Sequence, residues 1–188
     1  MRRFRRRDQG ATLVEVAVVL PILLTLAVGL AEVGFLVIDY ITVTNATRSG
    51  ARTGAAAADD PAADTSILDV VEEDVCNLRY GDVVRVQIYK ADPADGSMPD
   101  PVSSGLVNSY VPSGPLQCDA TGHAFVCDPG LSCTWDPASR DNVPPGFDAL
   151  GVRVEFSHEY VIGFVPLPTS NFTEDVVMQL EPDTGAGS

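Results

Sequence analysis

The chain has 188 residues and a formal net charge of −14. Its length allows one modest domain and an anchoring segment, but it is short for two full domains. Five of its twelve basic residues lie before Gly10, so the remainder is strongly acidic. This excludes a nucleic-acid groove, because phosphates require a basic surface. We therefore expect an acidic domain behind a basic head, with no nucleic-acid partner.

A long apolar run covers residues 16–38 and is interrupted by one charge, Glu32. A transmembrane helix needs about 20 mainly apolar residues. We expect such a helix over residues 11–38, with the basic residues 1–10 in the cytoplasm and the C-terminal part on the other side. A cleaved secretory signal is the alternative, and it needs a shorter apolar stretch followed by small residues, as 25–31 could supply.

Helical character continues after the apolar run, because residues 39–60 are rich in alanine and contain no proline before Pro61. We expect this part to project from the membrane as a helical stalk. Within the apolar half, Pro21 removes a backbone hydrogen bond and should kink the helix near Ala17.

Two sets of residues at helical spacing mark the second half of this helix. Arg48 and Arg52 share one face, and Ala46, Gly50 and Gly54 line another. Small residues four apart allow a close approach to this second face. The spacing leaves open whether another helix or the chain's own domain makes that approach.

Glu15 is an acid beside an apolar segment, where a carboxylate is costly without a partner. If the chain is cut after Gly10, Ala11 gains a free amine one helical turn from Glu15. The two groups could then pair within one chain or between neighbouring chains. Alternatively, Glu15 simply reaches the lipid headgroups.

These features together carry a resemblance to a known family. A basic leader, a glycine, a glutamate five positions later and an apolar helix resemble the processing site of type IV prepilins. Residues 10–56 are more narrowly similar to the TadE-like pseudopilins of the tight-adherence (Tad/Flp) systems. The shared positions are Gly10, Glu15, the Leu20-Pro21 pair, Glu32 and the A-x-R-x-G-A-R ending at 46–52.

The resemblance implies a minor pseudopilin that supports assembly of a Flp-type pilus or tight-adherence secretion apparatus. A prepilin peptidase would cut between Gly10 and Ala11, and Glu15 would act in recognition or assembly. Further partners would be other pilins or pseudopilins, the inner-membrane assembly platform and membrane lipid. The protein would cross the inner membrane once, with an extracytoplasmic C-terminal domain. Helix packing or the stalk would involve Pro21, Glu32, Arg48, Gly50 and Arg52.

The exported domain should occupy residues 61–182, with a disordered tail at 183–188. An apolar face predicts an amphipathic helix over 64–78. Alternating apolar residues predict strands at 83–91 and 152–157, and a weaker one at 174–180. Strands joined by loops, with a helix to one side, indicate an α+β fold with a small antiparallel sheet.

Residues 92–148 form an irregular insert by this interpretation, with a possible short strand in 122–128. Four cysteines follow the apolar run, and an even number in an exported domain favours two disulfides. A bridge from the helix to the insert would hold the insert in place, but three connectivities remain open. A zinc site is disfavoured, because no C-x₂-C pair occurs. The cysteines are Cys76, Cys118, Cys127 and Cys133.

No arrangement of residues predicts catalysis. His123 and His158 have no partner at a catalytic spacing, and no hydrolase or nucleotide-binding motif occurs. We expect no enzyme activity, no cofactor and no metal. The alternative to an assembly role is a membrane-anchored binding module that uses the cysteine-containing insert.

Overall fold

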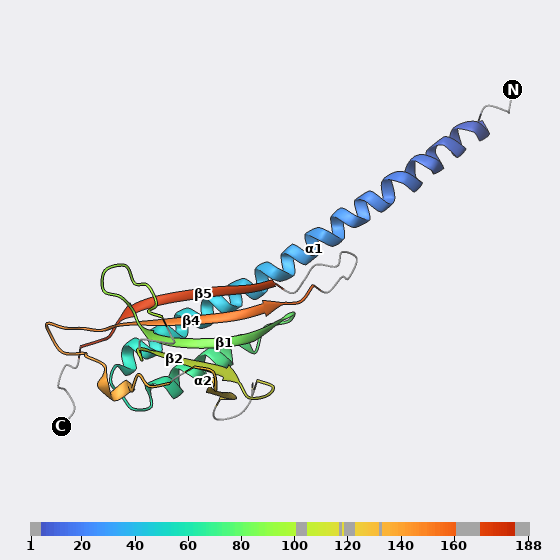
Figure 1. Ribbon diagram of the computed structural model, residues 1–188. Coiled ribbons are helices and arrows are strands. Elements are labelled where there is room, and N and C mark those ends of the chain that lie inside the picture. Colours follow the sequence, from blue (N-terminus) through green and yellow to red (C-terminus); the bar gives the residue numbers. More distant parts are fainter. Residues whose placement is uncertain are drawn as a thin grey trace.

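One helix, α1 (Arg5–Ala57), organises the whole molecule. The computed structural model describes residues 5–100, 105–116, 118, 123–131, 133–160 and 170–182. Residues 1–4 of the predicted leader and the predicted tail at 183–188 lie outside this range. Figure 1 shows that the first half of α1 projects alone, while its second half lies along the domain.

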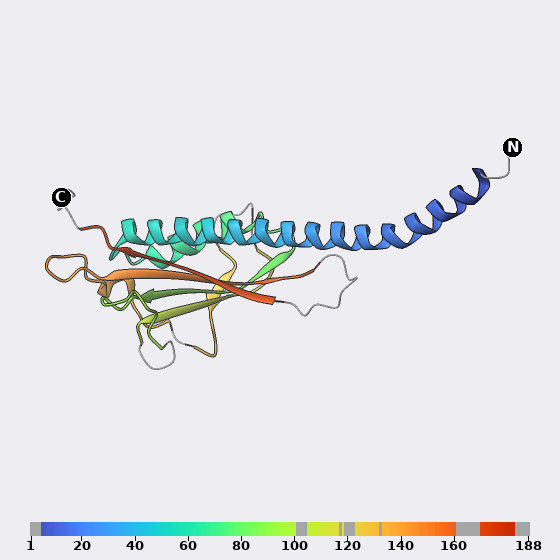
Figure 2. The same cartoon turned by 90° about the horizontal axis from the view of Figure 1, so that it is seen from above.

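The projecting half of α1 is bent. Figure 2 shows the bend in the N-terminal third of the helix, the part that contains Pro21. Proline cannot donate a backbone hydrogen bond, so the helix opens on that side. The Thr25 hydroxyl bonds to the carbonyl oxygen of Pro21 at 2.8 Å. The predicted kink is thus confirmed in this part of the helix.

The domain is a five-stranded antiparallel sheet in the order β3-β2-β1-β4-β5. The second half of α1 and the shorter helix α2 (Ala63–Val75) pack together beside it. The predicted α+β class is confirmed. The other elements are β1 (Gly81–Lys90), β2 (Val107–Pro112), β3 (Phe125–Cys127), the 3-10 helix η1 (Pro137–Ser139), β4 (Ala149–His158) and β5 (Ser170–Gln179).

The prediction of an irregular insert at 92–148 is wrong in part, because β2 and β3 come from it. The short strand expected in 122–128 is present as β3, but β2 was missed. Its positions facing α2 carry Asn108 and Tyr110, which both hydrogen-bond to Asp64, so polar groups stand where the pattern requires apolar side chains. A strand whose buried side is polar has no alternating apolar pattern by which to recognise it.

Strand β1 departs from the simple alternation expected of it. Its pairing with β4 shifts between Val83 and Arg85. As a result Val83 and Val86 are buried in the core, while Val84 is only half-buried. A bulge adds one residue to one strand and so reverses which side chains face inward.

The face of the sheet that points away from the helices is also covered, near the C-terminal end of β1. Tyr89 is fully buried there with Ala91 and Val107. Its ring lies where a side chain on Gly151 would be, so only glycine fits there. Burial, followed by the nearby Asp175 carboxylate, raises the pKa of Tyr89 to about 12.

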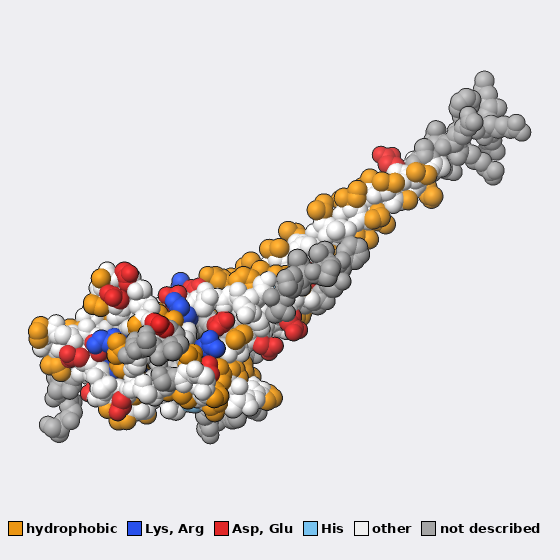
Figure 3. Space-filling view, in the orientation of Figure 1, with side chains coloured by type: hydrophobic (Ala, Val, Ile, Leu, Met, Phe, Trp, Pro, Cys, Tyr) orange, Lys and Arg blue, Asp and Glu red, His pale blue; other side chains and the backbone are white. Residues whose placement is uncertain are grey.

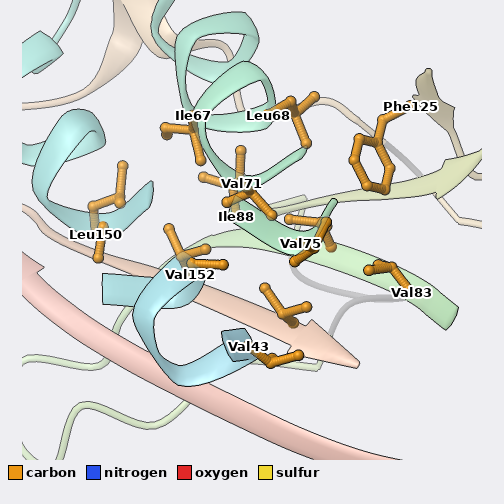
Figure 4. Packing of buried hydrophobic residues seen from close by; sticks show 14 of the residues in the cluster. Val43, Ile67, Leu68, Val71, Val75, Val83, Ile88, Phe125, Leu150 and Val152 are labelled. Carbon is orange, nitrogen blue, oxygen red and sulfur yellow. The ribbon is translucent and has the colours of Figure 1, made fainter. Parts of the chain in front are cut away.

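The main core lies between the two helices and the sheet (Figure 4). Helix α2 begins at Ala63 and buries the apolar face that the sequence predicted. Leu78 follows the end of the helix and packs against the same core. The buried residues of that face are Ile67, Leu68, Val71 and Val75.

Two glycines on α1 allow the helices to meet closely. A Cβ on Gly50 would lie 2.7 Å from Val71 Cγ2, and one on Gly54 would lie 2.7 Å from Ile67 Cδ1 and 2.9 Å from Leu150 Cδ2. Contacts this short force the neighbouring side chains to move. The glycines therefore set the distance between α1 and the rest of the domain.

We predict that Gly50→Leu lowers the free energy of unfolding of the domain by about 1–3 kcal/mol, because the added side chain overpacks the core. Urea unfolding of the full chain in detergent, followed by fluorescence of its single tryptophan, measures this. The matched control is Gly34→Leu on the same helix, where nothing lies within 4 Å of the added Cβ. Equal urea midpoints for the two variants would contradict the packing argument.

Candidate functional site

The predicted processing residues lie at the free end of α1. Gly10 is exposed within the helix, and a Cβ added there would have nothing within 4 Å. Glu15 is exposed one and a half turns further along. The groove beside its side chain is apolar, with Val16, Val19 and Leu20 among its lining. Both residues are thus exposed on the part of the helix that stands clear of the domain.

The projecting half of α1 has an apolar surface all round. Residues 12–31 are exposed, except for the half-buried Val28, and most are valine, leucine, isoleucine or alanine (Figure 3). Twenty residues of α-helix measure about 30 Å, the thickness of a bilayer's hydrocarbon core. Among the described residues, α1 is the only helix long and apolar enough to cross a membrane. Such a surface is unfavourable in water and suits lipid.

The second half of α1 is not a stalk that projects from the membrane, as residues 39–60 were expected to be. It packs against α2, β4 and β5. Arg48 and Arg52 lie on its exposed side, as predicted, and Ala46 and Gly50 are buried on the other. The chain's own domain therefore occupies the face of small residues. A helix of this length without a partner would have left that face exposed to water.

Residues 10–52 match the family of TadE-like proteins. The resemblance drawn from the sequence is confirmed over this segment, which is about a quarter of the chain. No curated protein and no solved structure matches the chain.

The TadE-like segment therefore covers both halves of α1. It contains Gly10 and Glu15 at the free end, and Glu32 where the helix becomes half-buried. It also contains Ala46 and Gly50, which face the core of the domain. The small residues near its end are thus explained by packing within one chain.

A buried hydrogen bond between an acid and a histidine joins the TadE-like segment to the sheet, and sequence reasoning missed it. The side chains of Asp39 and His158 are fully buried, and His158 Nδ1 lies 2.8 Å from Asp39 Oδ2. The backbone N–H of Arg79 donates to the other oxygen of Asp39 at 3.3 Å. The sequence does show each residue at a notable place, since Asp39 directly follows the apolar run and His158 directly follows a predicted strand. Nothing local connects them, because 119 positions separate them.

A second buried group holds the insert to α2. Asp64 accepts hydrogen bonds from Asn108 Nδ2 at 2.7 Å and from the Tyr110 hydroxyl at 2.8 Å, and it pairs with Arg140. The Arg140 guanidinium lies 4.3 Å from the centre of the Trp135 ring. Burial and the Asp64 carboxylate raise the pKa of Tyr110, so its hydroxyl remains a donor. These charged side chains therefore bind other parts of the same domain and hold the insert against α2.

The four cysteines form two disulfides, as expected. Cys76, just after α2, is bonded to Cys118, and Cys127 is bonded to Cys133. The first bridge ties the insert to the helix, which the sequence had offered as one of three connectivities. The second closes a small loop beside β3. Only the first bridge therefore fixes the insert to the rest of the domain.

The two histidines do not come together. His158 belongs to the buried pair with Asp39, and His123 is half-buried with its ring 6.4 Å from that of Phe125. Among the residues that the structure describes, no group of three or more His, Cys, Asp or Glu side chains could hold a metal ion. Both imidazole rings therefore contact other side chains of the domain and have structural roles.

We predict that His158→Ala lowers the free energy of unfolding by about 1–3 kcal/mol, because it leaves the buried Asp39 carboxyl group without the hydrogen bond to His158 Nδ1. Urea unfolding of the full chain in detergent measures this. His123→Ala is the matched control and should cost much less. Adding Asp39→Asn to the His158→Ala variant should recover part of the loss, and no recovery would show that the unpaired carboxyl group is not its cause.

Proposed function

We propose that this protein is a minor pseudopilin, which supports assembly of a Flp-type pilus or tight-adherence secretion apparatus. The observation that carries the proposal is the TadE-like segment, placed on a helix whose first half stands clear of the domain. A subunit of this shape can insert its bare half among lipid or other helices without unfolding its domain. The role is structural and requires no catalytic residue.

Cleavage after Gly10 by a prepilin peptidase is the first step of this function. The exposed helix end supports it, since a peptidase must bring its catalytic groups close to the backbone, and glycine has no Cβ to obstruct them. The basic residues before Gly10 would hold the leader on the cytoplasmic side. The domain would then lie outside the inner membrane, where disulfides persist.

Glu15 acts after cleavage by this proposal. Removal of the leader makes Ala11 the first residue, so Glu15 lies near the new N-terminus of the helix. A carboxylate is favoured there by the helix dipole and by the free α-amine. The carboxylate could pair with the α-amine of its own chain or with that of a neighbouring chain. Pairing between chains would set the register of adjacent subunits.

We predict that Gly10→Leu abolishes removal of the leader, while insertion in the membrane is unchanged. N-terminal sequencing of protein extracted from membranes measures this, and the native chain should begin at Ala11. Gly29→Leu is the control on the same helix, since a Cβ there also meets nothing within 4 Å. A native protein that begins at Met1, or after residue 25, would refute the proposed cut.

We predict that Glu15→Gln leaves cleavage intact but removes crosslinks to pilins and to the inner-membrane platform in native membranes. Glutamine keeps the size of the side chain and removes only its charge. The control is Glu159→Gln, an exposed acid of the domain. Loss of crosslinks in both variants, or in neither, would argue against a role for Glu15 in assembly.

A binding module that uses the insert is the second candidate. What favours it is the rigid attachment of the insert through Asp64 and the Cys76–Cys118 bridge. Crosslinking separates the two functions, because a binding module keeps its partner when Glu15 is replaced. Recovery of pilus components that depends on Glu15 supports the assembly role instead.

A further inference from the structure

Four aromatic residues gather where the domain first meets α1. We call Phe35, Tyr40, Tyr80 and Tyr160 the aromatic collar. The ring centres of Phe35 and Tyr80 are 4.7 Å apart, so the loop before β1 contacts α1 ahead of Asp39. The Tyr40 hydroxyl donates to Glu174 Oε2 at 2.7 Å.

The fourth ring belongs to the same end of the sheet. Tyr160 lies edge-on to His158, with ring centres 5.3 Å apart, and His158 binds Asp39. Gly81 pairs with His158, and His158 pairs with Ser170, so β1, β4 and β5 all have an end here. Figure 1 shows this end of the sheet nearest to the free half of α1.

The length of the bare helix places the collar at the membrane surface. Residues 12–31, the part of α1 outside the domain, measure about 30 Å and so match the hydrocarbon core. Phe35 follows only four residues later, about 6 Å further along the axis. No helix is left over to hold the domain away from the lipid. The collar must then lie at the depth of the headgroups.

The chemistry of the collar suits that depth. Tyrosine is enriched at membrane–water interfaces, because its ring is apolar and its hydroxyl is polar. Three of the chain's five tyrosines are in the collar. Phe35, Tyr80 and Tyr160 are half-buried and Tyr40 is 42% exposed, so none of the four residues is closed off from the surface.

The charges at this end argue for a neutral lipid surface. Arg79, Asp82 and Glu159 are exposed near the collar and include one base against two acids. A basic patch for anionic lipids is therefore missing among these described residues. Binding would depend on apolar and aromatic contact and would be insensitive to salt.

We propose that the aromatic collar binds the headgroup region of the bilayer, which seats the domain on the membrane and fixes the depth of α1. This rests on the membrane span of the proposed function. With residues 12–31 in the hydrocarbon core, Glu15 lies within about one helical turn of the opposite boundary. There its carboxylate remains hydrated at small cost, close to the cleaved end.

Indole fluorescence in phosphatidylcholine vesicles tests the proposal. Full-length Tyr80→Trp protein is reconstituted with lipids brominated either near the headgroups or near the bilayer centre. The emission at position 80 should be quenched most by the shallow bromine, and increased salt should not change this. The native protein gives the baseline, because its single tryptophan, Trp135, is 4% exposed and belongs to the core.

Two further variants separate the possible failures. Leu24→Trp reports insertion of the helix and should be quenched by deep bromine. Val143→Trp is an exposed site on a loop beyond η1 and should be quenched by neither lipid. If position 24 is quenched and position 80 is not, the seating proposal is wrong while the membrane span holds. If position 24 is not quenched, the span itself fails, and the proposal fails with it.

Discussion

The contact between the small-residue face of α1 and the rest of the domain is the constraint on which this structure depends. Gly50 and Gly54 bring the helix within van der Waals contact of α2 and β4. Asp39 and His158 then fix its position along the axis through a fully buried pair. Since breaking this contact leaves buried polar groups without a hydrogen-bond partner, sliding of the helix relative to the sheet is unfavourable.

One helix therefore has two kinds of surface. Its first half has an apolar surface on every side, and its second half has a buried face of small residues and an exposed face with Arg48 and Arg52. The change occurs within about two turns, between Glu32 and Asp39. The helix is continuous through this change, and its bend lies in the N-terminal third, the part that contains Pro21.

The acidic character of the chain has a structural use in the domain. Asp64 and Glu72 are buried on α2 and accept hydrogen bonds from the insert, through Asn108 and the backbone N–H of Ala124. With the Cys76–Cys118 bridge, they hold a segment that has little regular structure. A domain of this size buries limited apolar surface, so bonds of this kind add needed stability.

Features that depend on neighbouring residues could be predicted before the fold was known: the long apolar helix, the buried face of α2, the alternation of β4 and the TadE-like motif from Gly10 onward. Periodicity reveals these because each follows from local backbone geometry. Three features required the folded structure: the partner of Asp39, the pairing of the cysteines and the place of β2, whose buried Asn108 breaks the apolar pattern. Those contacts join residues far apart in the chain, and which of them meet depends on how the sheet and helices pack, which no local pattern contains.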